Sequence, residues 1–197
     1  MGACFLEEKM KILFCIVGRS ATGKDTLTNA ICRDLQMEKV VSHTTREPRA
    51  GEKEGINYYF SAAVQLFAAE DAQNIAASTK IGDNYYWTTK DEILGKDFYV
   101  IDPEGLESLR ANIKNENIRL VSIYITAPTL EREKRALLRD PQNIKKYLNK
   151  CEAEDAQFSE YEHWRPYDYC VHNAHFESAL EQLKIIINKE KEKIYAI

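Results

Sequence analysis

The stretch "GRSATGKDT", residues 18–26, has the residue types and the spacing of a loop that binds phosphate. Its two glycines let the chain turn sharply, so that backbone N–H groups and the charge of Lys24 face one anion. The next position usually carries the hydroxyl of Ser or Thr, which helps to hold a magnesium ion, but here it is Asp25, followed by Thr26. The predicted ATP phosphate site comprises Gly18, Arg19, Ser20, Ala21, Thr22, Gly23, Lys24, Asp25 and Thr26, and Asp25 and Thr26 are its candidate Mg²⁺ ligands.

A second group of anion-binding residues lies in "SHTTREPRAGEKEGINYYF", residues 42–60. Arg46 and Arg49 are three residues apart, and Tyr58 and Tyr59 follow closely. Guanidinium groups bind a phosphate monoester in bidentate fashion, and phenol groups add hydrogen bonds. A donor site in the loop and an acceptor site in this segment together indicate a phosphotransferase.

The elements that must position these residues follow from the apolar pattern. Short apolar runs predict strands, and longer runs of helical period separate them. The expected strands cover residues 11–18, 39–42, 97–102, 119–126 and 168–173, and the expected helices cover 25–35 and 104–113, start near 129, and run from 176 to 187. The loop therefore lies between a buried strand and a helix, and strands that alternate with helices predict a parallel α/β sheet.

Two stretches interrupt this alternation. Residues 43–90 are rich in Tyr, Thr, Gly and charge, which favours a small mixed subdomain inserted into the sheet protein. Residues 128–162 are strongly charged and helical, with a thin apolar stripe formed by Ile144, Tyr147, Leu148, Cys151 and Phe158.

Composition limits the kind of partner and the compartment. The chain has 197 residues, which fits one domain, and its net charge of −4 argues against a nonspecific nucleic-acid-binding protein. No run of 18 apolar residues exists, so no membrane span is expected. The five cysteines form no Cys-x-x-Cys pair or zinc spacing, which predicts free thiols in a reducing cytoplasm.

The whole set of motifs resembles the guanylate kinase family. The resemblance rests on "GRSATGKDTL", "VSHTTREPRAGEKEGINYYF", "DNYYWTT" and "VIDPEG", and it extends from about residue 11 to about residue 190. It implies one guanylate-kinase-like domain over residues 1–197, an α/β fold with a P-loop and a parallel-sheet core. That core covers about 10–43, 89–128 and 163–197, with an inserted monophosphate-binding subdomain at about 44–88 and a helical lid at about 129–162.

The resemblance also implies roles for individual residues. Arg46, Arg49, Tyr58 and Tyr86 match positions that hold the acceptor phosphate, Ser42 and Thr88 match positions that help to read guanine, and Asp102 matches an Asp near the base and the metal. Lys24, Arg135 and Arg139 match groups that act on the transferred phosphoryl group, and Asn173 matches an Asn near the adenine of ATP. The implied reaction is the Mg²⁺-dependent phosphorylation of GMP or dGMP by ATP, with small nucleotides as the partners.

The sequence departs from the family at several of these positions. Ala77 stands where the family reads guanine with a Glu, so Ser78 or Thr79 would have to substitute unless the register slips. Trp87 replaces a Gly and would either stack on a base or pack in the subdomain core. Val100 stands where the family has an Asp. Tyr147 falls near a position where the family has a lid Arg, and Lys146 or Lys150 are candidate replacements for that Arg.

Two other functions remain open from the sequence. Ribose bisphosphokinases resemble guanylate kinases and often carry Gly-Lys-Asp in the loop, as residues 23–25 do here. Guanylate-kinase-like domains of scaffold proteins bind phosphopeptides without catalysis, but they usually lose the phosphate-binding loop. A substrate panel separates the first alternative from a nucleoside monophosphate kinase, and ATP binding separates the second.

Overall fold

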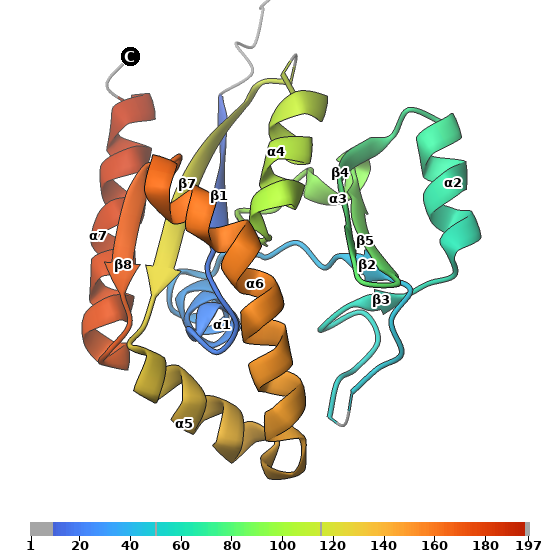
Figure 1. Ribbon diagram of the computed structural model, residues 1–197. Helices are drawn as coiled ribbons and strands as arrows, with labels where there is room; N and C mark the ends of the chain where they lie inside the picture. Colours follow the sequence, from blue (N-terminus) through green and yellow to red (C-terminus); the bar gives the residue numbers. More distant parts are fainter. Residues whose placement is uncertain (1–9, 50, 115, 196–197) are drawn as a thin grey trace, which may run out of the picture.

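The computed structural model describes residues 10–49, 51–114 and 116–195, which form two β-sheets flanked by helices. The larger sheet lies in one part of the molecule, together with α1 (Lys24–Leu35), α5 (Thr129–Arg139), α6 (Ile144–Trp164) and α7 (Phe176–Tyr195) (Figure 1). The smaller sheet lies beyond α4 (Pro103–Asn112). The larger sheet contains β1 (Lys11–Val17), β6 (Phe98–Val100), β7 (Ile118–Thr126) and β8 (Tyr169–His172), in the order β6-β1-β7-β8. All of its neighbouring strands are parallel, which confirms the predicted α/β core.

Helices cover both faces of this sheet, as its buried central strand β1 requires. Phe14 and Ile16 of β1 pack with α1 (Lys24–Leu35) and α7 (Phe176–Tyr195). Leu13 and Cys15 point to the other face and pack with α4 (Pro103–Asn112) and α6 (Ile144–Trp164). The alternation of side chains along β1 therefore places the phosphate-binding loop between two well-packed layers.

The smaller sheet is built from residues 43–89. It contains β2 (His43–Thr44), β3 (Tyr59–Phe60), β4 (Ile75–Ile81) and β5 (Asn84–Thr89), in the order β3-β2-β5-β4. The helix α2 (Ala63–Asp71) lies beside it, and α3 (Lys90–Ile93) leads back to the core. Trp87 is 2% exposed and stacks on His43 with a centroid distance of 5.0 Å, so its ring packs inside the subdomain and not on a base.

Two sequence predictions differ from the structure. The strand expected at 39–42 is reduced to one bridge between Lys39 and Phe98, because this segment leaves the core sheet towards the smaller one. The helical stretch divides into α5 (Thr129–Arg139), a short 3₁₀ turn (Pro141–Asn143) and α6, and Leu148 of the predicted apolar stripe is 45% exposed. Within the described ranges, no helix has the length and apolar character needed to span a membrane.

Candidate functional site

The phosphate-binding loop turns tightly against the core, and two glycines make this possible. A Cβ atom at Gly18 would lie 2.4 Å from the carbonyl oxygen of Ile125. A Cβ atom at Gly23 would lie 2.4 Å from Nδ2 of Asn173, and Gly23 has a φ of 91°. No side chain caps α1, so the N–H groups of its first turn remain available to a phosphate.

Cationic and amide side chains donate hydrogen bonds to the backbone carbonyl oxygens of the loop. Arg132 donates from Nε to the carbonyl of Ser20 at 3.1 Å. Arg135 and Asn173 both donate to the carbonyl of Thr22, at 3.1 Å and 2.7 Å, and Arg135 also donates to the carbonyl of Asn173 at 2.8 Å. Three predicted residues, Thr22, Arg135 and Asn173, therefore lie together, and Arg132 joins them without having been predicted.

Lys24 folds over the loop, and its ammonium group donates to the carbonyl of Arg19 at 2.9 Å. Burial lowers the pKa of Lys24 to about 8; the charges of Lys150 and Arg132 lower it further, whereas Asp25 and Glu154 oppose the shift. The amine therefore titrates near neutral pH in the protein without nucleotide. A bound polyphosphate would stabilise its charged form.

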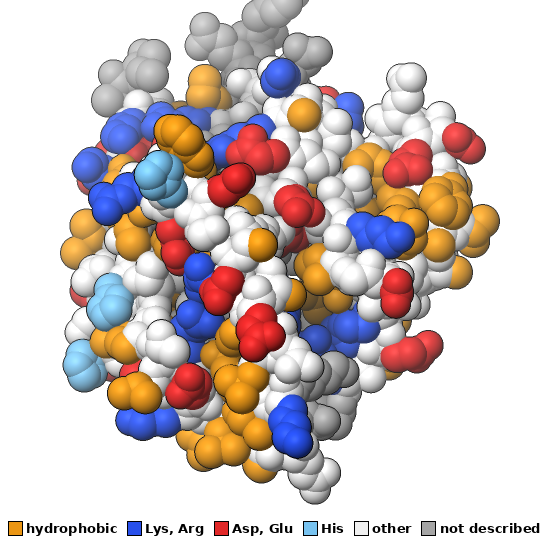
Figure 2. Space-filling view, in the orientation of Figure 1, with side chains coloured by type: hydrophobic (Ala, Val, Ile, Leu, Met, Phe, Trp, Pro, Cys, Tyr) orange, Lys and Arg blue, Asp and Glu red, His pale blue; other side chains and the backbone are white. Residues whose placement is uncertain are grey.

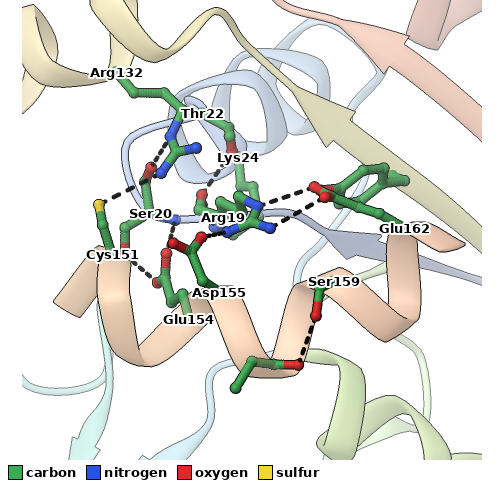
Figure 3. A network of polar contacts seen from close by, with 12 residues as sticks. Arg19, Ser20, Thr22, Lys24, Arg132, Cys151, Glu154, Asp155, Ser159 and Glu162 are labelled. Carbon is green, nitrogen blue, oxygen red and sulfur yellow. Dashed lines mark hydrogen bonds and ion pairs between the residues drawn. The ribbon is translucent and has the colours of Figure 1, made fainter.

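The helix α6 brings three carboxylates to the loop (Figure 3). Glu154 accepts hydrogen bonds from the backbone N–H of Ser20 at 2.9 Å and from its hydroxyl at 2.5 Å. Arg19 pairs with Asp155 and, through Nε at 2.9 Å, with Glu162. Acidic side chains are numerous on this side of the molecule (Figure 2). No sequence motif indicates these contacts, because acidic residues on a charged helix usually face solvent.

Asp25 and Thr26 lie in the first turn of α1 and are both exposed. A carboxylate and a hydroxyl are the hard oxygen ligands that Mg²⁺ accepts, and this ion usually keeps several waters and phosphate oxygens beside one or two carboxylates. The two side chains therefore fit a Mg²⁺ site of that kind. The described residues contain no group of three or more His, Cys, Asp or Glu that could hold a metal without further ligands.

The predicted acceptor residues lie together on the smaller sheet. Arg46 donates to both carboxylate oxygens of Glu52, at 2.9 and 3.0 Å. Its guanidinium carbon lies 5.4 Å from the centroid of the Tyr58 ring. The rings of Tyr58 and Tyr86 meet edge to face at 5.9 Å. Tyr59 points away from this group and packs against His43, 4.9 Å between ring centroids.

The acceptor group (Arg46, Arg49, Tyr58 and Tyr86) lies close enough to the phosphate-binding loop for the charge of Asp25 to act on Tyr58. Burial raises the pKa of Tyr58, and the charge of Asp25 raises it further, whereas the charges of Arg46 and Arg49 lower it. Arg49 is exposed, and its backbone N–H donates to Glu52 at 2.8 Å. Glu52 therefore orients Arg46 and the loop that carries Arg49, a role that no motif in the sequence indicates.

Three hydroxyl groups meet beside the acceptor residues. Thr88 accepts from the hydroxyl of Tyr99 at 2.8 Å and donates to Ser42 at 3.2 Å. Asp102 lies two residues beyond the end of β6 and is the N-cap of α4, where its side chain accepts from the N–H of Gly105 at 3.0 Å. Burial raises the pKa of Asp102.

The predicted lid residues fall into two groups. Arg135 reaches the loop, as described above, whereas Arg139 is exposed in the last turn of α5. Tyr147 is 8% exposed, so it is not available as a free phosphate ligand in this arrangement. Lys150 pairs with Glu154 at 3.5 Å, and the side chain of Lys146 lies outside the part of the chain that the structure describes.

The parallel sheet, its phosphate-binding loop and the inserted smaller sheet define a P-loop phosphotransferase fold. The family model described as guanylate kinase matches residues 10–190, so the chain belongs to the guanylate kinase family, as the sequence motifs indicated. It is 34% identical over 192 residues to a guanylate kinase of Rickettsia felis, covering 93% of this chain and 96% of that protein. It is also 31% identical to a guanylate kinase of Haemophilus ducreyi, covering 92% and 89% of the two chains.

The fold agrees with a solved structure from the same family. The crystal structure of guanylate kinase from Anaplasma phagocytophilum has a TM-score of 0.66 with this protein. The match covers 93% of this chain and 87% of that chain, at 22% sequence identity. This likeness supports the α/β architecture described above.

Proposed function

We propose that the protein transfers the γ-phosphoryl group of ATP to GMP or dGMP and releases ADP and the nucleoside diphosphate. Family membership supports this proposal, and so does one structural observation: Tyr58 of the acceptor group lies within electrostatic reach of Asp25 in the phosphate-binding loop. Phosphoryl transfer needs alignment of two phosphates and neutralisation of charge more than covalent chemistry by the protein. The phosphate-binding loop and the acceptor group would supply both.

On the ATP side, the loop residues and Lys24 would hold the β- and γ-phosphates. Arg135 lies against the loop and Asn173, where it supports the nucleotide site. Arg139 is exposed at the end of α5 and would reach the transferred group when the lid, residues 129–162, moves towards the loop. Closure would also exclude water and limit hydrolysis of ATP.

On the acceptor side, Arg46, Arg49, Tyr58 and Tyr86 would hold the phosphate of the monophosphate in line with the donor. The residues 44–88 would act as the monophosphate-binding subdomain, and Ser42 and Thr88 would lie beside the base with Asp102. The acceptor phosphate oxygen is itself the nucleophile, so the proposal requires no separate general base.

Asp25 and Thr26 would hold Mg²⁺, directly or through water, and Asp102 is a third candidate contact. The ion would neutralise charge on the phosphates of ATP. An Asp25→Ser variant tests this assignment, because its magnesium requirement should differ from that of the parent. An unaltered requirement would count against Asp25 as a ligand.

The compartment and the partners are part of the same proposal. Cys15, Cys32, Cys151 and Cys170 are free thiols in the described part of the chain, which fits the reducing cytoplasm. The expected partners are small nucleotides, with no nucleic acid.

A coupled assay of ADP formation with GMP, dGMP, AMP, UMP and ribose bisphosphate tests the proposed reaction. We expect the highest kcat/KM with GMP or dGMP. A preference for ribose bisphosphate would instead support the bisphosphokinase alternative, which Ala77 and Asp25 made worth testing. Failure to turn over any acceptor, together with no ATP binding in calorimetry with Mg²⁺, would favour a binding module.

A further inference from the structure

The position where the family reads guanine contains no acceptor in this chain. Ala77 lies on β4, is 1% exposed and pairs with Thr88 across the strands. The hydroxyl of Thr88 is held by Ser42 and Tyr99, and the residue has no exposed surface. A carboxylate is the natural partner for the two adjacent N–H donor groups of guanine, and this face of the sheet supplies none of its own.

The helix α4 brings a carboxylate to the same face of β4. Thr79 lies two residues from Ala77 along the strand, so their side chains share one face, and Thr79 is paired with Tyr86 of the acceptor group. The hydroxyl of Thr79 donates to Oε2 of Glu104 at 3.3 Å. Glu104 therefore lies beside β4, in contact with the residue two positions along the strand from Ala77.

Glu104 belongs to a row of polar side chains that joins α4 to β4. Ser108 accepts from the N–H of Ser78 at 3.1 Å, and Asn112 donates to the carbonyl of Ala76 at 3.3 Å. Residues 104, 108 and 112 are spaced four apart, so they occupy one face of the helix. Glu104 is the member of this row nearest the N-terminus of α4, which Asp102 caps.

We propose that Glu104 is the specificity-determining residue that accepts from N1–H and the 2-amino group of guanine, in place of the carboxylate that Ala77 lacks. This inference rests on the proposed function and names the residue that selects its acceptor. Thr79 positions the carboxylate, and the ionised side chain offers acceptors only, so it matches two donors and disfavours a base with an acceptor at that edge. AMP and UMP lack this pair of donors and are poor substrates.

The Glu104→Gln variant tests the inference with GMP and XMP. Xanthine carries a carbonyl where guanine carries the 2-amino group, so a Gln amide matches xanthine by accepting from N1–H and donating to that carbonyl. We expect the kcat/KM for GMP to fall about 10- to 100-fold, as for a lost polar match in a specific site. The kcat/KM for XMP is not reduced, which also shows that the variant is folded.

Glu107→Gln is the matched control, because Glu107 lies on the same helix, is exposed and pairs with Arg110 at 2.6 Å, away from β4. This variant keeps the parent's ratio of kcat/KM for GMP to kcat/KM for XMP. A Glu104→Gln protein that also keeps this ratio, while the parent prefers GMP, overturns the inference and leaves the proposed function intact. A parent that phosphorylates no nucleoside monophosphate overturns the proposed function, and the inference with it.

Discussion

The titration of Lys24 predicts that the affinity for ATP depends on pH above neutrality. With a pKa of about 8, the amine of the free protein is about nine-tenths protonated at pH 7 and about one-tenth protonated at pH 9. Bound phosphates keep the amine charged, so binding at higher pH must first take up a proton. The dissociation constant for MgATP should therefore rise about tenfold between pH 7 and pH 9, with an uptake of about half a proton at pH 8.

Isothermal titration calorimetry in buffers of different ionisation enthalpy measures both quantities. The Lys24→Met variant is the control, because it removes the titrating group. We expect it to bind MgATP about 10- to 100-fold more weakly at pH 7, since a hydrogen bond to a charged group is lost, and to show no comparable slope. A parent with pH-independent affinity, or a variant with the same slope as the parent, would refute the role of Lys24.

The same pKa fixes the sign of an effect on stability. Lys24 has a folded-state pKa of about 8, below the 10.5 of an unperturbed lysine side chain, so the unfolded chain binds more protons between these two pH values. Its contribution to stability thus rises with pH in this window, and the buried charge costs up to about 3 kcal/mol below pH 8. Lys24→Met should melt at a higher temperature than the parent at pH 7, with the difference shrinking towards pH 10.5. A lower melting temperature at pH 7 would contradict this explanation of the pKa.

Three further substitutions test separate parts of the structure. Arg49→Ala should reduce kcat/KM by at least about tenfold, because one charge-assisted contact is lost, and it should leave the melting temperature the same. An unchanged kcat/KM would show that Arg49 is not part of the acceptor site. Glu154→Gln should cost about 1–2 kcal/mol of stability, since its bonds to Ser20 lose their charge, and an unchanged denaturation midpoint would contradict that contact. Trp87→Ala should cost about 3–5 kcal/mol because the ring is buried; a loss below about 1 kcal/mol in urea denaturation would argue against its packing in the subdomain core.

The sequence predicted those elements whose signal is local. The apolar strand before Gly18 and the helix after Gly23 appear at the expected places, because periodicity and glycine placement act within a few residues. The terminal helix begins at Phe176 as expected but continues beyond Ile187 to Tyr195. The prediction of a strand at 39–42 was wrong, because a four-residue segment with two valines cannot show whether it pairs within a sheet or crosses between two sheets.

The candidate site was predictable only where a motif carried it. Arg46, Tyr58 and Tyr86 belong to short recognisable segments, and the structure brings them together. The contact of Glu154 with Ser20 joins residues 134 positions apart, and nothing in the local sequence distinguishes this Glu from a solvated one. The choice between Trp87 on a base and Trp87 in the core likewise depended on His43, which lies on another strand.

The most direct test of the central claim follows the phosphoryl group itself. The purified protein is incubated with γ-labelled ATP, Mg²⁺ and GMP, and the products are separated. The proposed function predicts that the label appears in GDP, in an amount equal to the ADP formed. Label found only in inorganic phosphate, or left entirely in ATP, would contradict it.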